Sequence, residues 1–305
     1  MKNKFSHQEI TLEGKPRAYV EFRSPQNIWF NTGTLCNLEC SNCYIESSPR
    51  NDRLSYLTKL DVLPYLDEIG ENNWQLESIG LTGGEPFLNP HIFEILNEIL
   101  RRGHEVLVLT NAYKVIKRIQ KPLLKLKESY GDKLKLRISM DHYTHKIHNL
   151  ERGEGTLAET LKSFSWLFNQ GFKLSIAGRY LSDDTYEGAL MGYSELLKGS
   201  GIALRLNAKN LIIFPEMNEN EDVPEISTAC WDILGVNPQD QMCASSRMIV
   251  KFKGEDSPKV QACTLLAYDQ NFTMAKGLKE SFRPVYLNHK FCAKFCVLGG
   301  ANCSS

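Results

Sequence analysis

Apolar and polar residues alternate in two different ways along residues 27–215, and this alternation predicts strands and helices in turn. Short apolar runs such as 76–81 and 105–112 are typical of buried strands, whereas the apolar residues of 92–100 recur at helical spacing. That helix has predicted ends, with Asn89 as N-cap, Pro90 in its first turn and Gly103 after its last turn. The predicted strands span 27–35, 76–81, 105–112, 133–141, 173–181 and 202–214, and further helices are predicted over 114–129, 156–170 and 184–198.

This order of elements predicts an α/β fold with a parallel sheet. Parallel neighbours need crossover connections about as long as the helical stretches seen here, and helices then cover the sheet. Six strand–helix units favour an open, partial (β/α)6 TIM-like barrel over a closed barrel of eight units. A doubly wound open sheet is the structural alternative.

The predicted strand at 133–141 alternates apolar residues with polar ones. If helices cover its apolar face, its polar face points into the barrel, where charged groups need a partner or a ligand. The polar residues of this strand are Lys135, Arg137, Ser139 and Asp141, and residues at comparable places on the next two strands are Arg179, Arg205 and Asn207. We expect a polar lumen that binds a ligand. The alternative is a pair of distorted edge strands with one solvent-exposed face.

After Pro215 the strand–helix alternation stops. Residues 216–225 are acidic and rich in turn formers, which predicts a linker, and the rest of the chain consists of short irregular pieces. We therefore predict an N-terminal extension over 1–26, a barrel over 27–215 and a small irregular C-terminal domain over 216–305. This last part holds six of the nine cysteines, Cys230, Cys243, Cys263, Cys292, Cys296 and Cys303. A metal centre would stabilise such a segment.

Composition excludes some classes of function. The 36 basic and 36 acidic residues balance, and no dense Lys/Arg block is present, so nucleic-acid binding is not expected. The chain shows neither a signal peptide nor an apolar run long enough to span a membrane, so we expect a cytoplasmic protein without membrane contact. Nine cysteines in a reducing compartment are better explained as metal ligands than as disulfides.

The first three cysteines follow the first predicted strand in the pattern C-x3-C-x2-C. Cys36, Cys40 and Cys43 lie within eight residues, and the next histidine in the chain is His91. A structural zinc site takes four ligands, usually as two pairs. Three thiolates on a four-iron cubane would leave one iron free to bind a further ligand. The spacing favours such a cluster, with zinc or chance as the alternatives.

A second motif, "GLTGGEP" over 80–86, ends the next predicted strand. Parallel barrels place their active sites at this end of their strands. Gly83 and Gly84 allow backbone to approach a ligand closely, and Glu85 brings a carboxylate to the same rim. The motif alone could be a tight turn before a helix; beside the cysteine loop it fits a site for an amino-acid-like ligand.

Together "CNLECSNC", "LTGGEP", "LTNA" and "SMDHYTHKIHNLERG" resemble the radical S-adenosylmethionine (SAM) superfamily, over about 27–215. The resemblance implies that the first three cysteines bind a 4Fe-4S cluster whose fourth iron is chelated by the methionine amino and carboxylate groups of SAM. It further implies that the Gly-Gly-Glu turn accepts from the methionine ammonium, and that Ser139 and Arg179 contact the ribose and carboxylate. Asn42 stands where the family often has an aromatic residue, which leaves adenine contact by this loop open.

The C-terminal cysteines suit a second cluster. Cys243 and Cys263 flank a predicted hairpin that turns at 254–258, and Cys292 and Cys296 follow in "HKFCAKFC". Four thiols can ligate a complete second 4Fe-4S cluster. The arrangement resembles, in part, the twitch and SPASM extensions of radical SAM enzymes. Cys303 could replace one ligand, and a zinc site is the alternative.

Three weaker patterns are interpreted without assigning chemistry to them. Cys230 is predicted to be a buried apolar thiol. His142, His145 and His148 are predicted to lie in a solvated loop rather than to bind a metal, because a spacing of three drifts off one helix face. "RGEGT", which begins at Arg152, is predicted to be a turn that enters a helix.

The predicted function is that of an oxidoreductase-like radical SAM enzyme. The resemblance implies reductive cleavage of SAM to a 5′-deoxyadenosyl radical, which abstracts hydrogen from a small metabolite or a short peptide while the second cluster assists oxidation. A one-electron donor such as flavodoxin or ferredoxin is the implied partner. About 26 residues precede the first strand, which favours the small metabolite. The alternatives are a peptide- or protein-modifying maturase of the same superfamily and a non-enzymatic iron–sulfur or zinc scaffold.

Overall fold

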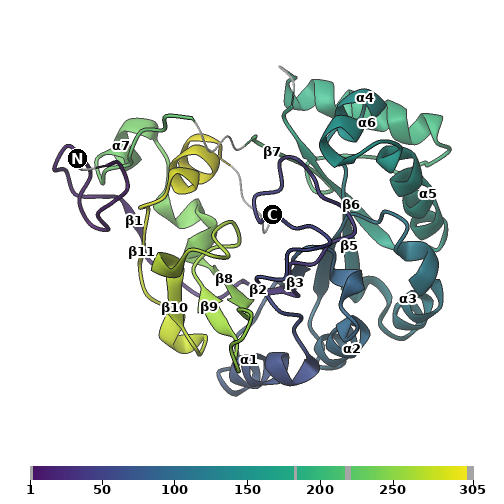
Figure 1. The fold of residues 1–305 in the computed structure, drawn as a ribbon, viewed down its shortest axis with the longest axis horizontal. Helices are drawn as coiled ribbons and strands as arrows, with labels where there is room; N and C mark the ends of the chain where they lie inside the picture. The colour runs from purple at the N-terminus through teal and green to yellow at the C-terminus, as the bar shows by residue number, and fades with distance from the viewer. Residues whose placement is uncertain (1–2, 182–183, 217–220, 301–305) are drawn as a thin grey trace.

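The computed structural model describes residues 3–181, 184–216 and 221–300, and its centre is one curved sheet (Figure 1). Within the described residues this sheet has nine strands in the order β10-β9-β8-β2-β3-β4-β5-β6-β7. The parallel strands of the barrel are β2 (Asn27–Asn31), β3 (Ser78–Thr82), β4 (Val106–Thr110), β5 (Leu134–Ser139), β6 (Lys173–Arg179) and β7 (Leu211–Phe214). The predicted parallel α/β barrel is confirmed.

Helices cover one face of this sheet (Figure 1). They are α1 (Lys59–Glu71), α2 (Ile92–Arg101), α3 (Ile116–Tyr130), α4 (His145–Arg152), α5 (Thr156–Asn169) and α6 (Tyr186–Gly199). On β5 the apolar residues Leu134, Leu136 and Ile138 are fully buried in the core between sheet and helices. A doubly wound sheet would need helices on both faces, so the partial barrel is the correct alternative.

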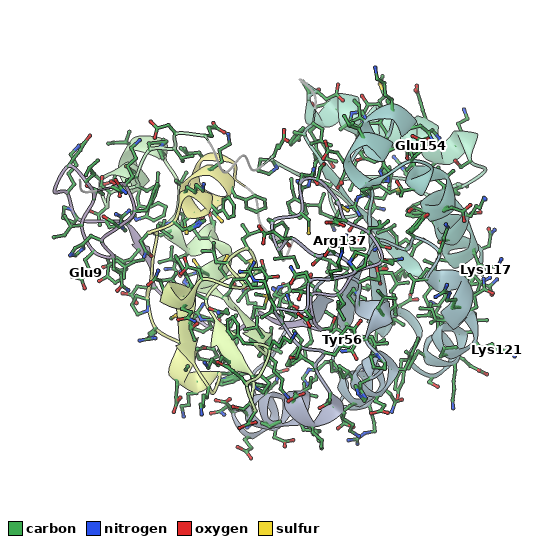
Figure 2. The ribbon with its side chains drawn as sticks, in the orientation of Figure 1. Glu9, Tyr56, Lys117, Lys121, Arg137 and Glu154 are labelled. Atoms are coloured by element: carbon green, nitrogen blue, oxygen red, sulfur yellow. The ribbon has the colours of Figure 1, made fainter. Side chains whose placement is uncertain are left out.

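The polar face of β5 points away from these helices. Figure 2 shows Arg137 near the centre of the molecule, whereas Lys117 and Lys121 lie on its outer surface. Lys135 and Arg137 line a cavity near the starts of the strands, whereas Ser139 lines a different cavity near their ends. The polar positions of this strand therefore contribute to two separate hollows.

The predicted sixth strand is shorter than expected. β7 spans Leu211–Phe214, and residues 202–210 contain no strand. Asn207 instead closes a turn, because its side chain accepts from the Lys209 amide (2.8 Å) and its carbonyl accepts from the Leu211 amide (2.9 Å). Arg205 and Asn207 are exposed. The prediction that they line the barrel is wrong.

The start of α2 also differs from the prediction. The helix begins at Ile92 with His91 as its N-cap, after a short 3-10 turn at Pro86–Leu88. The side chain of Asn89 accepts from the His91 amide (2.8 Å) and donates to the carbonyls of Thr32 (3.0 Å) and Leu57 (2.8 Å). Asn89 is therefore no N-cap, and it ties together the two ends of the segment that carries the first cysteines.

The C-terminal region continues the same sheet. β8 (Ser246–Val250) pairs with β2 in parallel, and β9 (Lys259–Gln261) and β10 (Thr273–Ala275) follow as antiparallel neighbours. The predicted hairpin around 254–258 is thus confirmed as β8–β9. Outside this sheet, β1 (Tyr19–Val20) pairs with β11 (Val285–Tyr286), and α7 spans Cys230–Leu234.

The boundary predicted at residue 215 follows the end of β7 directly. The two predicted domains nevertheless share one sheet, because β8 lies beside β2, and the division stays a prediction. Residues 217–220 of the predicted linker and Cys303 lie outside the described residues. In the described part of the chain, no helix has the length and apolar character needed to cross a membrane.

Candidate active site

The three thiols of Cys36, Cys40 and Cys43 line one cavity at the carboxyl ends of the parallel strands. Their loop follows β2, and the opposite walls come from the ends of β3, β4, β5 and β6. Of the residues predicted to bind SAM, Gly83, Gly84, Ser139 and Arg179 line this cavity. We call it the SAM-side cavity. The structure thus brings together all three thiols and four of the five predicted SAM contacts.

Hydrogen-bond donors are directed at the thiols. The Leu38 amide donates to Cys36 Sγ (3.4 Å), and the Ser47 amide donates to Cys43 Sγ (3.3 Å). The side chain of Asn111, which belongs to the "LTNA" stretch, also donates to Cys36 Sγ (3.5 Å). Such donors stabilise negative charge on sulfur, and in iron–sulfur proteins they tune the potential of the cluster.

The two glycines of the Gly-Gly-Glu turn allow this turn to pack against the cysteine loop. The Gly84 amide donates to the Gly33 carbonyl (2.8 Å). A Cβ on Gly84 would lie 2.2 Å from the carbonyl oxygen of Leu35, and one on Gly83 would lie 2.4 Å from that of Gly33. Gly83 also has φ +137°, which favours glycine. In this structure the close approach is to backbone of the cysteine loop.

Glu85 is almost fully buried and lies outside the lining of the SAM-side cavity. Its carboxylate accepts from the hydroxyl of Thr110 (2.8 and 2.9 Å), the amide of Asn111 (2.8 Å) and the amide of Phe87 (3.1 Å). Burial raises the pKa of Glu85 to about 7, against the lowering effect of these donors. Glu85 thus joins the end of β3 to the end of β4, and its contact with an ammonium group stays a prediction.

A buried ion pair that the sequence analysis did not assign to the site lies beside the thiols. Arg152 donates to Asp141 through Nε (2.7 Å to Oδ2) and Nη2 (2.9 Å to Oδ1), and Arg179 Nε lies 3.7 Å from Asp141 Oδ1. Burial would raise the pKa of Asp141, but the two guanidinium groups lower it. Burial would lower the pKa of Arg152, but Asp141 and the sulfur of Cys40 raise it.

Arg152 is the last residue of α4 and lines the SAM-side cavity, so it is more than the helix-entry turn that was predicted. A signal was present in the sequence, because Asp141 and Arg152 begin and end the polar part of "SMDHYTHKIHNLERG". What the sequence did not show was that α4 turns back, so that its last turn meets the end of β5.

The histidine prediction for this segment is wrong in part. His145 and His148 lie on α4, and His142 and His148 are buried rather than solvated, although His145 is exposed. Burial, with the charge of Arg152, lowers the pKa of His148 to about 3, while the nearby Asp141 opposes the shift. Neither ring nitrogen of His148 has a hydrogen-bond partner. α4 packs this ring inward, which spacing alone did not predict.

Three residues that line the SAM-side cavity each carry a buried donor without a partner. These donors are Asn42 Nδ2, Ser47 Oγ and Arg179 Nη1. Buried polar groups in proteins are nearly always paired, so these three are suited to a ligand that brings acceptor oxygens. A carboxylate and ribose hydroxyls are such acceptors, and three thiols beside them can bind iron. The residues present therefore fit a 4Fe-4S cluster with SAM.

The four tail cysteines line a single cavity, which we call the tail cavity. Its thiols belong to Cys243, Cys263, Cys292 and Cys296. Burial raises the pKa of Cys243 to about 12 and also raises that of Cys263 and Cys292. Metal binding would remove these thiol protons. Four thiols around one hollow fit a second cluster.

Cys230 differs from these four. It is half-buried at the start of α7, where its Sγ accepts from the Ser227 amide (3.4 Å) and packs against the tail core. Throughout the described residues, no three His, Cys, Asp or Glu side chains gather around the position of a single metal ion.

Comparison with known proteins gives the family. The model of the "Radical SAM superfamily" matches residues 30–189. The subtilosin biosynthesis protein AlbA of Bacillus subtilis is 30% identical over 186 residues, which are 61% of this chain and 39% of that protein. The mycofactocin maturase MftC of Mycolicibacterium smegmatis is 25% identical over 167 residues, which are 53% of this chain and 40% of that protein. The chain thus spans about two fifths of the length of these relatives.

Solved structures show the same fold. The anSMEcpe structure with bound AdoMet has a TM-score of 0.59 at 17% identity, with 85% of this chain and 77% of that chain covered. Streptococcus suis SuiB bound to its precursor peptide SuiA has a TM-score of 0.58 at 16% identity, with 81% of this chain and 61% of that chain covered. Radical SAM proteins use a 4Fe-4S cluster and SAM. With the family model matching more than half of its length, the chain belongs to the Radical SAM superfamily.

Proposed function

We propose that this chain is a peptide-modifying radical SAM enzyme that uses two 4Fe-4S clusters. The proposal rests on the SAM-side cavity, whose lining residues supply three thiols and three buried donors without a partner. A non-enzymatic scaffold would need the thiols but not the donors. The cluster and SAM, when bound, would supply a carbon-centred radical able to abstract hydrogen from an unactivated C–H bond.

Different residues of the site would bind the first cluster and the different parts of SAM. Cys36, Cys40 and Cys43 would ligate the first cluster and leave one iron for SAM. Arg179 is suited to the SAM carboxylate, because its Nη1 has no partner while its Nη2 donates to the Asn42 carbonyl (2.9 Å). Ser139, at the end of β5, is suited to the ribose.

Two further groups of residues prepare the site for this ligand. The Asp141 carboxylate holds Arg152 and Arg179 in place before SAM arrives, so less orientation is needed on binding. The Gly-Gly-Glu turn, through Gly83, Gly84 and Glu85, would face the methionine ammonium.

The tail cysteines Cys243, Cys263, Cys292 and Cys296 would ligate the second cluster. Four protein ligands leave no open iron, so a redox role is favoured over direct binding of substrate. A one-electron donor such as flavodoxin or ferredoxin would reduce the first cluster.

A peptide is favoured as substrate over the small metabolite that the sequence analysis preferred. The relatives include a subtilosin biosynthesis protein and a mycofactocin maturase, and one solved structure of the same fold holds a precursor peptide. This evidence is stronger than the expectation drawn from the 26 residues before the first strand.

Anaerobic reconstitution with iron and sulfide tests the proposal. Two cubanes give about eight irons per chain, and the Cys36→Ala, Cys40→Ala, Cys43→Ala variant should retain about four. Dithionite with SAM should release 5′-deoxyadenosine from the wild type, and this triple variant should release none. The Cys230→Ala variant is the matched control and should keep both the iron and the release. Stoichiometric zinc in place of iron, or release by the triple variant, would contradict the proposal.

A further inference from the structure

A third cavity, which we call the middle cavity, lies between the two cavities that the cysteines line. It shares four lining residues with the SAM-side cavity: Tyr44, Thr82, Leu109 and Arg179. It shares two with the tail cavity: Leu265 and Phe295. A group in the middle cavity would therefore lie beside the SAM-side cavity on one side and beside the tail cavity on the other.

The wall of the middle cavity is apolar. Its remaining lining residues include Trp29 on β2, Phe214 at the end of β7 and Thr264. Arg179 contributes the one charge of this described lining, and it is already engaged with Asp141 and with the Asn42 carbonyl. Its one unpartnered nitrogen, Nη1, is the one assigned above to the SAM carboxylate, so with SAM bound a charged side chain placed here would lose its water without gaining a charged partner.

Two aromatic walls limit the size of the middle cavity. Trp29 is 1% exposed and packs against Gly80, where a Cβ would lie 2.2 Å from the indole. Phe214 stacks on Phe295 with ring centroids 5.6 Å apart. The cavity measures about 50 Å³. One water needs roughly 10–15 Å³ by this measure, so there is room for roughly three to five heavy atoms.

We propose that the middle cavity binds one aliphatic side chain of the peptide substrate, of the size of valine, leucine or isoleucine. These side chains have three or four heavy atoms, whereas phenylalanine has seven and the cavity would have to widen for it. The inference rests on the proposed function and adds to it the class of side chain that is presented to the SAM-side cavity. Hydrogen abstraction requires the C–H bond to lie against the radical source, and the four shared lining residues place the middle cavity directly beside the SAM-side cavity.

Phe214 is the residue that tests this assignment. It lines the middle cavity but neither of the two cavities that hold thiols. It is only half-buried, so its truncation should leave the fold intact. Phe214→Ala should enlarge the cavity by most of a ring, whereas Phe214→Asp should place an unpaired charge in its wall. Phe252 is a half-buried phenylalanine that lines none of these cavities, and Phe252→Ala is the matched control.

The probes are the blocked tripeptides N-acetyl-Gly-X-Gly-amide with X valine, leucine, phenylalanine, aspartate or lysine. Their dissociation constants are measured by anaerobic equilibrium dialysis against the reconstituted holoenzyme with SAM present. The valine and leucine peptides should bind at least about tenfold more tightly than the aspartate and lysine peptides. Phe214→Ala should shift the preference toward phenylalanine by about tenfold, Phe214→Asp should abolish the preference for leucine, and Phe252→Ala should change nothing.

Equal binding of the leucine and aspartate peptides, including the absence of binding by both, would overturn the inference. So would a Phe214→Ala variant with the wild-type order of preference. Release of 5′-deoxyadenosine with dithionite and no peptide is measured in parallel on each variant. Failure of that release in the wild type would refute the proposed function, whereas the order of peptide binding reports on the middle cavity alone.

Discussion

Removal of the guanidinium of Arg152 should destabilise the protein strongly, because it leaves a buried carboxylate with one distant partner. Asp141 is 2% exposed, and Arg152 makes both of its short contacts, at 2.7 and 2.9 Å. Arg179 Nε remains, but at 3.7 Å. Loss of one partner from a buried ion pair costs about 3–5 kcal/mol. We expect a loss of this size for Arg152→Gln at pH 7.

Most of this loss of stability should disappear when the Asp141 carboxylate is removed as well. The Asp141→Asn, Arg152→Gln double variant buries two neutral amides in place of two charges, and its cost should be far smaller than the sum of the single costs. A double-mutant cycle on the anaerobic protein, followed by urea unfolding, measures this coupling. We expect a coupling free energy of about 2 kcal/mol or more.

An exposed pair supplies the control for this cycle. Lys253 and Asp52 lie 2.5 Å apart, but their side chains are 64% and 51% exposed. Exposed pairs contribute about 1 kcal/mol or less, so Lys253→Gln with Asp52→Asn should show weak coupling. Equal coupling in the two pairs, or a wild-type midpoint for Arg152→Gln, would refute the reasoning.

Three other changes have definite expected outcomes. Gly84→Ala brings a methyl group within 2.2 Å of a carbonyl oxygen, so it should lower both the unfolding midpoint and the iron bound by the first three thiols. Gly70→Ala, where a Cβ would have no atom within 4 Å, should lower neither; unchanged iron in Gly84→Ala would argue against the packing described. Hydrogen bonds from Arg101 and Arg102 lower the pKa of Glu98 to about 2, so Glu98→Gln should cost about 1–3 kcal/mol at pH 7, and the difference from wild type should vanish as pH falls from 4.5 toward 2 in acid-unfolding curves. His148 has a pKa of about 3 in the folded protein but takes up a proton near pH 6.5 when unfolded. The free energy of unfolding should therefore fall by about 2 kcal/mol as the pH is lowered from 8 to 5. Urea titrations of His148→Leu should not show this loss.

The parts of the site that could be predicted from sequence are those in which chemistry and position are local. Three cysteines within eight residues must lie close together, and a Gly-Gly-Glu turn after a strand must lie at the rim of a parallel barrel. The apolar face of β5 was also predictable, because alternation along one strand assigns its residues to faces without knowledge of other strands.

The parts that were missed depend on contacts between distant segments. Arg152 meets Asp141 because α4 turns back onto β5, and its charge alone was compatible with an exposed helix end. Arg205 and Asn207 alternate as in a strand, but the asparagine forms a turn with its own neighbours that competes with the sheet. His148 has helical neighbours that bury it, and a spacing of three between histidines carried no information about that burial.

The relation between the two sets of thiols is fixed by backbone pairing rather than by the loops that carry them. β8 pairs with β2 in the register Asn27–Ser246, and β9 pairs with β8, so Cys243 and Cys263 are held at the ends of strands that belong to the barrel sheet. The buried side chain of Arg247 strengthens this attachment, since it donates to the Cys243 carbonyl (2.7 Å). A slip of one residue would turn this guanidinium to the other face of the sheet. The β8–β2 register therefore fixes how the strand ends beside Cys243 and Cys263 are placed relative to the strand that leads into the first three cysteines.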